Sequence, residues 1–197
     1  MDDSADAYEQ HANVFLKRRD ASTIGREIVR QWGRTLPEDS TVIELACGSG
    51  YPITQALTES ISQLWAIDSS PTLLRTFQSR FPHVPVQCST VQTSDFFNRQ
   101  FDAVIAVGLL FLLSESVQMS VITTVSSKLN PGGRFLFTAP TQTGTWRDLT
   151  TGIQCTSLGE QRYLEILSKA NLKTVATYMD DGQNHYYEAM RVNESVL

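Results

Sequence analysis

The sequence predicts an α/β fold: a doubly wound, mostly parallel seven-stranded sheet with helices on both faces and a C-terminal antiparallel hairpin. Three observations predict it. From Thr41 onward short apolar runs alternate with helical segments, the first run ends in a glycine turn, and the last two runs flank a polar loop. Such alternation is typical of parallel sheets with right-handed crossovers. Ligands bind these sheets at the carboxyl ends of the strands, so the loops after residues 46, 68, 88, 107 and 139 should converge.

Composition is that of an ordinary soluble globular protein. Hydrophobic residues make up 41% and charged residues 19% of the 197 residues, enough for a real core in one domain. The formal net charge of −5 lacks the basic footprint of a nucleic-acid-binding protein. We therefore expect no nucleic acid among its partners.

Nothing in the chain predicts a membrane or secreted location. No apolar run is long enough to span a bilayer, and the start Met1-Asp2-Asp3 is too acidic for a secretory signal. The three cysteines are widely spaced and form no CxxC pair. We expect free thiols in a reducing cytoplasm and no metal site.

The first 35 residues predict an arm followed by a helix. Ser22 is the expected cap of a helix over 22–34, whose apolar face would hold Ile24, Ile28, Val29 and Trp32. The arm before this helix contains aromatic and basic side chains and is a candidate lid. The alternative is that its arginines are solvated and its aromatics pack on the helix.

The segment 41–52, TVIELACGSGYP, is the stretch around which the chain is organised. Its β-branched run predicts a buried strand over 41–46, which ends at Gly48 and Gly50. Glycine lets the backbone turn sharply and approach a ligand. Pro52 suits the first turn of a helix over 52–60. Strand, glycine turn and helix N-terminus together predict a nucleotide-type site.

The second apolar run, 63–67, ends in Asp68, which lies 18 residues after Gly50. This is close to the spacing of roughly 20 residues at which an acid binds a ribose diol. The alternative is that Asp68 caps the helix predicted over 71–80. A dinucleotide fingerprint would need glycine or alanine where Ile53 stands, and Glu44 would repel a pyrophosphate. Glu44 instead favours a ligand with a positive charge.

The remaining elements follow in order. A short run over 84–88 and a buried strand over 101–107 precede a helix over 115–129 and a strong turn at Asn130-Pro131-Gly132-Gly133. After the strand 134–138 a loop over 140–145 leads to a helix over 158–170. Runs at 172–178 and 185–191 predict a hairpin that completes seven strands.

Four ordered segments resemble the signatures of class I S-adenosylmethionine (SAM)-dependent methyltransferases. They are the motif Glu44-Leu45-Ala46-Cys47-Gly48-Ser49-Gly50, the acid Asp68, the strand start Phe101-Asp102-Ala103-Val104 and the turn Leu129-Asn130-Pro131-Gly132-Gly133. The similarity covers residues 40–140, about half of the chain. The family usually has glycine where Ala46 stands, which is a mild departure.

The resemblance implies a set of cofactor contacts. Glu44, Ala46, Cys47, Gly48 and Gly50 would wrap the methionine part, and Asp68 with Ser69 would hold the ribose. Val107 begins the loop that passes the methionine end. An N-terminal helix often closes over the cofactor in this family, and our candidates there are Tyr8, Phe15 and Arg19.

Two loops depart from the family pattern. Many members hold the adenine amino group with an acid after the third strand, where this chain has Ser89 and Thr90. Either hydroxyl could accept that hydrogen bond, and a polar loop without ligand contact is the alternative. After the fourth strand the chain lacks the Asn/Asp-Pro-Pro-aromatic signature of nucleobase amino methylation. This absence argues against such a substrate.

The resemblance implies methyl transfer to an O, N or S nucleophile of a small molecule. We expect one domain over 1–197: arm and helix at 1–35, cofactor core at 40–140 and substrate side at 141–197. If a base is used, Asp148 and His185 are the candidates. Trp146 could stack on an aromatic or cationic acceptor, Phe111 could line its pocket, and Tyr186 could contact it. For each the alternative is a structural role.

Two other functions remain open. One is a regulatory or scaffold protein that binds SAM or S-adenosylhomocysteine (SAH) without turnover. The other is a nicotinamide-dependent oxidoreductase, which Ile53, Glu44 and the absence of a Tyr-x-x-x-Lys pair disfavour. The oligomeric state is expected to be a monomer or a homodimer.

Overall fold

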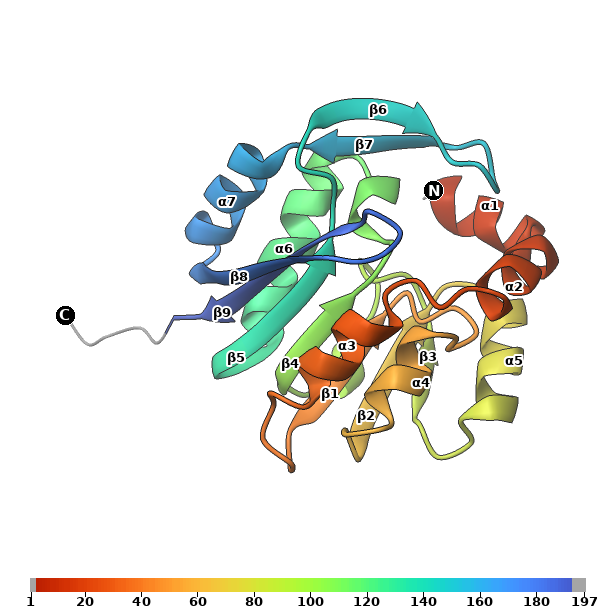
Figure 1. Ribbon diagram of the computed structural model, residues 1–197, viewed down its shortest axis with the longest axis horizontal. Coiled ribbons are helices and arrows are strands. Elements are labelled where there is room, and N and C mark those ends of the chain that lie inside the picture. The colour runs from red at the N-terminus through yellow and green to blue at the C-terminus, as the bar shows by residue number, and fades with distance from the viewer. Residues whose placement is uncertain (1–2, 193–197) are drawn as a thin grey trace.

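The computed structural model describes residues 3–192; residues 1–2 and 193–197, which belong to the predicted arm and substrate side, lie outside the described part. Within that range the main sheet has seven strands in the order β3-β2-β1-β4-β5-β9-β8 (Figure 1). The strands from β3 to β5 pair in parallel, and β9 is antiparallel to both its neighbours. The predicted fold class is confirmed. The strands are β1 Thr41–Leu45, β2 Gln63–Asp68, β3 Val86–Cys88, β4 Phe101–Ala106, β5 Leu129–Thr138, β8 Leu172–Met179 and β9 His185–Arg191.

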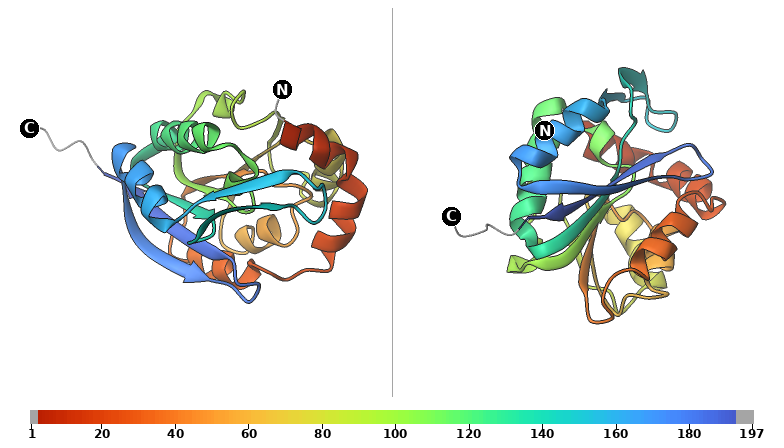
Figure 2. Two further views of the ribbon diagram at one scale, coloured as in Figure 1. Left: turned by 90° about the horizontal axis from the view of Figure 1, so that it is seen from above. Right: turned by 60° about the vertical axis from the view of Figure 1, so that its left-hand side comes forward.

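Helices cover both faces of this sheet (Figures 1 and 2). One face carries α3 Arg26–Gly33, α4 Ile53–Leu57 and α5 Pro71–Arg80. The other carries α6 Glu115–Lys128 and α7 Glu160–Lys169. Two short 3-10 turns, Phe96–Asn98 and Leu110–Leu112, flank β4.

The core lies on both sides of β1 and β4, which explains their unbroken apolar runs. Ile43 and Val104 pack against α6, while Val42 and Ile105 pack against α3 and α4. Each fully buried aliphatic side chain contributes about 1.5–3 kcal/mol relative to an exposed one. This double burial fixes the carboxyl ends of the two central strands, where the site lies.

The helix predicted over 22–34 begins later than expected. It starts at Arg26, and the side chain of Ser22 accepts a hydrogen bond from the Ile24 N–H instead of capping the helix. The cause is Gly25, which is left-handed (φ 85°) and lies against the Tyr186 hydroxyl. A Cβ at Gly25 would come within 2.5 Å of that oxygen. The helix predicted over 52–60 is also shorter, with Pro52 at its cap.

The loop predicted over 140–145 is wrong in its second half, where a strand begins at Thr143. β6 Thr143–Arg147 pairs antiparallel with β7 Gln154–Leu158 in a separate two-stranded sheet. The arm forms two helices, α1 Asp3–Gln10 and α2 Ala12–Asp20. The β6–β7 hairpin extends above the main sheet toward α1 (Figure 1). Across residues 3–192, none of the helices has the length and apolar character that crossing a bilayer requires.

Candidate active site

The carboxyl ends of the parallel strands surround a cavity of about 250 Å³. Its walls come from α1 and α2, from the loops after β1, β2 and β4, from the end of β5 and from the two hairpin turns. The loop after β3 borders a second cavity of about 40 Å³, which shares Ala46, Asp68 and Ser69 with the first. Four of the five loops that should converge therefore border these cavities, and β5 contributes its last residue, Thr138, in place of the loop after 139.

The glycine turn after β1 forms the floor of the cavity. Gly48 is left-handed (φ 57°) and donates its N–H to Asp68 Oδ2 at 2.8 Å. Gly50 (φ 90°) faces away from the cavity, and a Cβ there would lie 2.3 Å from the Phe81 ring. Gly48 thus faces the cavity, whereas Gly50 lets α5 pack against the turn. Ala46 is also left-handed (φ 56°), a conformation that glycine adopts more easily.

Asp68 ends β2 and is buried at the edge of the cavity. It accepts hydrogen bonds from the N–H groups of Gly48 and Ser70, each at 2.8 Å. Ser70, and not Asp68, caps α5 by accepting the Leu73 N–H. A carboxylate has about four lone-pair sites, so two of them are left for the hydroxyls of a ligand. Burial raises the pKa of Asp68, and its two backbone donors oppose that shift.

Glu44 is the last but one residue of β1 and is only 3% exposed. The Thr54 hydroxyl donates to Glu44 Oε2 at 2.6 Å. Burial raises the pKa of Glu44 to about 8, although the hydrogen bond from Thr54 and the charge of Arg19 pull it down. A positive ligand group in the cavity would restore the carboxylate at neutral pH.

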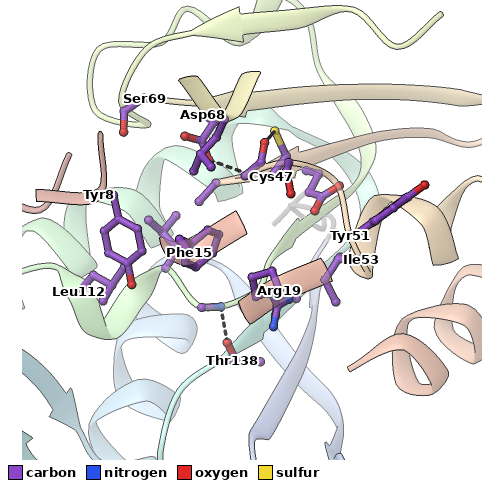
Figure 3. Close-up of a pocket in the computed structure, with 18 of the residues that line it drawn as sticks. Tyr8, Phe15, Arg19, Cys47, Tyr51, Ile53, Asp68, Ser69, Leu112 and Thr138 are labelled. Atoms are coloured by element: carbon purple, nitrogen blue, oxygen red, sulfur yellow. Dashed lines mark hydrogen bonds between the residues drawn. The ribbon is translucent and has the colours of Figure 1, made fainter. Parts of the chain in front are cut away.

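The N-terminal helix pair, α1 and α2, closes one side of the cavity. Tyr8, Phe15 and Arg19 lie along this side, across from Asp68 and Cys47 (Figure 3). The Phe15 ring would be 3.3 Å from a Cβ at Gly48, so the aromatic ring covers the glycine turn. Burial lowers the pKa of the Arg19 guanidinium, and the acidic groups of Tyr186, Glu44 and Asp180 oppose that shift.

Two further contacts attach the helix pair to α5. Glu9 accepts hydrogen bonds from Ser70 and from the Thr72 hydroxyl, the latter at 2.6 Å. Asp20 forms an ion pair with Arg80 at 2.6 Å. Arg80 also donates to Ser49 in the glycine turn and stacks on the Tyr51 ring, so the pair is fixed at both ends.

The wall opposite the glycine turn is aromatic and contains one acid. Phe111 lines the cavity and packs against Trp146 of β6, with ring centroids 5.5 Å apart. Trp146 itself is 38% exposed and does not line the cavity. Asp148 follows β6 and lines the cavity beside the Tyr8 hydroxyl. Its charge and, above all, burial raise the pKa of Tyr8.

The structure separates the two proposed bases. Asp148 faces the cavity, whereas His185 does not line it. The His185 ring packs edge-on against Tyr187 at 4.6 Å, on the other face of β9 from Tyr186, and burial lowers its pKa. Tyr186 lines the cavity, but its hydroxyl donates to Asp180 at 3.0 Å.

The second, smaller cavity contains both polar residues proposed after β3. Ser89 and Thr90 line it together with the apolar side chains of Val91, Leu109 and Leu113. The Ser89 hydroxyl is buried and has no hydrogen-bond partner among residues 3–192. A flat group with a polar edge would fit between these surfaces.

Several residues that line the main cavity were missed by sequence reasoning. Thr138, at the end of β5, accepts the Gly108 N–H at 2.7 Å, and Asn184 precedes β9. The rule that ligands meet the carboxyl ends of strands could have identified Thr138. No comparable rule identified Asn184. It lies in the β8–β9 turn, where its backbone N–H and its side-chain amide donate to Asp180.

The first comparison with known proteins points to a family. Residues 42–133 match the model of the methyltransferase domain, a stretch that contains Glu44, the glycine turn, Asp68 and β4. Over this stretch, just under half of its length, the chain is similar to a methyltransferase domain. The residues that carried the resemblance lie within this match or directly at the cavity.

The curated relatives that match this chain are distant. A tRNA U34 carboxymethyltransferase of Idiomarina loihiensis is 26% identical over 120 residues, covering 54% of this chain and 36% of that protein. An uncharacterized methyltransferase of Mycobacterium tuberculosis is also 26% identical over 120 residues, covering 58% of this chain and 59% of that protein. The chain thus spans between about a third and three fifths of these relatives.

Solved structures share the fold of the methyltransferase domain at low identity. The N-methyltransferase NodS from Bradyrhizobium japonicum, in complex with SAH, has a TM-score of 0.69 at 18% identity and covers 93% of this chain and all (100%) of that chain. The 1,6-didemethyltoxoflavin-N1-methyltransferase of Burkholderia thailandensis, with its substrate and SAH bound, has a TM-score of 0.70 at 16% identity, covering 92% of this chain and 87% of that chain.

The residues of this site fit SAM, the cofactor of the family. The open lone pairs of Asp68 match a ribose diol, and the unpartnered Ser89 hydroxyl lies where a flat base would fit. Glu44 and Arg19 offer one negative and one positive group for the amino and carboxylate ends of the methionine part.

Proposed function

We propose that the protein transfers a methyl group from SAM to an O, N or S nucleophile of a small-molecule acceptor by in-line displacement. One observation carries the proposal: a single cavity joins the glycine turn and Asp68 to an aromatic wall with Asp148. A cofactor on the first side and an acceptor on the second would share one enclosed space. In-line attack depends mainly on such alignment.

The chain's own residues divide the work. Asp68 and Ser69 hold the ribose, Gly48 and Cys47 approach the methionine part, and Ser89 or Thr90 meets the adenine. The bound cofactor supplies a methyl group made electrophilic by its sulfonium. Phe15 and Arg19 from the helix pair exclude water from that end and act as a lid.

A small acceptor suits this site better than RNA. The helix pair and the β6–β7 hairpin meet over the cavity, where Arg18 donates to Thr150 at 3.1 Å. The formal net charge of −5 gives no electrostatic attraction to a polyanion. The tRNA-modifying relative matches little more than a third of its own length (36%), so its substrate is not transferred to this chain.

Calorimetric titration and an SAH-release assay test the proposal. We expect SAM and SAH to bind with one site each, NADH not to bind, and SAH to form with acceptors from a panel of amines, phenols, carboxylates and thiols. Binding without any turnover would favour a regulatory protein, and absence of SAM binding would refute the cofactor assignment.

A further inference from the structure

The acceptor side of the cavity combines two aromatic pairs with one carboxylate. Tyr8 and Phe15 meet edge to face at 5.4 Å, and Phe111 and Trp146 meet at 5.5 Å. Asp148 lies between α1 and β6. Resting on the function proposed above, we propose that the acceptor is an amine, bound as a cation against Asp148 and the rings of Tyr8 and Phe111.

The geometry of Asp148 leaves one oxygen for the cavity. The hydrogen bonds from its own turn all go to Oδ2: from the Thr150 N–H at 3.0 Å and from the N–H and hydroxyl of Thr151, both at 2.7 Å. These donors fix the carboxylate in place. The turn therefore orients Asp148 without using Oδ1, and the remaining partner of the carboxylate is the Tyr8 hydroxyl, which also lines the cavity.

The arginines near Asp148 donate hydrogen bonds to neutral groups and not to its carboxylate. Arg147 donates to the Gly152 carbonyl and Arg18 to the Thr150 hydroxyl, each at 3.1 Å. Within residues 3–192 Asp148 forms no ion pair. Arg19 also lines the cavity, and the acidic groups that act on it are Tyr186, Glu44 and Asp180. A positive group on the acceptor would complete the charge balance at Asp148.

The aromatic rings suit the same charge. A cation within about 6 Å of a ring centroid gains roughly 0.5–2 kcal/mol, more when water is excluded. Tyr8 lines the cavity from α1, and Phe111 lines it from the 3-10 turn after β4. An anionic acceptor would meet repulsion from Asp148, and a neutral hydroxyl would leave the negative charge of that carboxylate without a counter-charge.

The proposed methyl transfer balances in atoms and charge with the groups present at this site. The ammonium form of the acceptor gives a proton to Asp148, directly or through the Tyr8 hydroxyl, and exposes the nitrogen lone pair. The nitrogen then forms a bond to the methyl carbon as the carbon–sulfur bond breaks, and that electron pair stays on sulfur. The methylated ammonium is the product, and the proton on Asp148 leaves to solvent.

A pair of isosteric probes tests the charge without turnover. Choline and 3,3-dimethylbutan-1-ol have the same shape, but only choline is cationic. We expect the complex with SAH to bind choline at least tenfold more tightly than the alcohol, by calorimetry or thermal shift. Asp148→Asn keeps an amide oxygen for the turn and removes the charge, so it should abolish the difference.

Control variants separate charge, ring and folding effects. Asp39→Asn removes one exposed negative charge at the amino end of β1 and should leave the preference intact. Phe111→Leu keeps apolar volume without a ring and should weaken choline severalfold while leaving the alcohol unchanged. Equal binding of the two probes to the wild type, or no binding of choline, would overturn the amine assignment.

Turnover supplies the second readout. In the SAH-release assay 2-phenylethylamine should react at least tenfold faster than 2-phenylethanol or 2-phenylethanethiol. Reaction of the alcohol or thiol in preference to the amine would overturn this inference while leaving methyl transfer established. Failure of SAM to bind would instead refute the proposed function itself, so the two failures are distinguishable.

Discussion

Glu44 and Asp68 lie at the carboxyl ends of neighbouring strands, yet the protein treats their charges differently. Asp68 accepts two backbone N–H groups that stabilise its carboxylate, whereas Glu44 has one hydroxyl donor and deeper burial. Glu44 therefore shares a proton near neutral pH, and Asp68 serves as a fixed acceptor. The motif placed both acids at the site from sequence alone. Their different protonation could not be predicted, because it depends on Thr54 and Arg19 around them.

Replacing Asp68 should weaken cofactor binding specifically. Asp68→Asn removes hydrogen bonds to a charged group, each of which contributes about 1.5–3 kcal/mol, so the Kd for SAM should rise roughly 10- to 150-fold. Asp102→Asn is the matched control, since Asp102 holds Thr41 and Asn130 at the opposite end of β4. That variant should lose stability with an unchanged Kd. Calorimetry that gives both variants the same Kd would contradict the role of Asp68.

The raised pKa of Glu44 predicts a pH dependence of stability. Its pKa is near 4.5 in the unfolded chain and about 8 when folded, so between these values the native state binds more protons than the unfolded state. Stability contributed by this group is therefore lost as pH rises from 4.5 to 8. Glu44→Gln should gain stability relative to wild type by more than about 1.4 kcal/mol between pH 5 and pH 8.5. Urea unfolding at both pH values measures the difference, and a constant difference would be inconsistent with it.

Gly50 should not tolerate a side chain. Gly50→Ala combines left-handed strain of about 1–2 kcal/mol with a clash against Phe81, which adds roughly 1–3 kcal/mol. Gly132→Ala is the control, because Gly132 is also left-handed (φ 76°) but has nothing within 4 Å of its Cβ position. Thermal unfolding of both variants isolates the clash. Equal destabilisation of Gly50→Ala and Gly132→Ala would show that the Phe81 ring moves aside at little cost in free energy, which would contradict the prediction.

At the scale of elements, the sequence was enough to predict the central strands and the β8–β9 hairpin. It was not enough to predict the β6–β7 hairpin or the start of α3. β1, β2, β4 and β9 carry apolar patterns that burial on one or two faces explains. β6 is exposed along its whole length, so no hydrophobic alternation marked it as a strand. The start of α3 depends on the contact of Gly25 with Tyr186, which is far along the chain. Local patterns do not contain such information.

The helix pair should open more readily when its anchor is removed. Arg80→Ala removes the ion pair with Asp20, the bond to Ser49 and the stacking on Tyr51. Together these contribute about 1–2 kcal/mol, so hydrogen exchange in α1 and α2 should accelerate roughly 5- to 30-fold. Gln78→Ala, which changes an exposed side chain on the same helix, should leave that exchange unchanged. Indistinguishable exchange in the two variants would rule out Arg80 as the anchor.

At the scale of the whole molecule, segments from both ends of the chain meet over one edge of the sheet. α1 and α2 come from the start, the β6–β7 hairpin and the β8–β9 turn from the last third, and all contribute to the cavity. A ligand between them would connect elements that are otherwise joined by few polar contacts. Binding should therefore stabilise the fold as a unit.

SAH should raise the unfolding temperature measurably. At a concentration of 100 times its Kd a ligand adds about 2.7 kcal/mol of stability. For a domain of this size each kcal/mol raises Tm by about 2–4 °C, which predicts a shift of roughly 5–10 °C. Scanning fluorimetry with SAH, and with NADH as the control, measures it. A shift with NADH and none with SAH would reverse the cofactor assignment.

The separation of the β6–β7 hairpin from the main sheet has a consequence for diversification. The hairpin carries Trp146 and Asp148 but shares no strand pairing with the sheet that holds Asp68 and the glycine turn. If Trp146 and Asp148 bind the acceptor as proposed, mutations in the hairpin should change the acceptor without disturbing the cofactor half. Transplanting the turn between Arg147 and Gln154 among relatives should then give new acceptors on an unchanged scaffold.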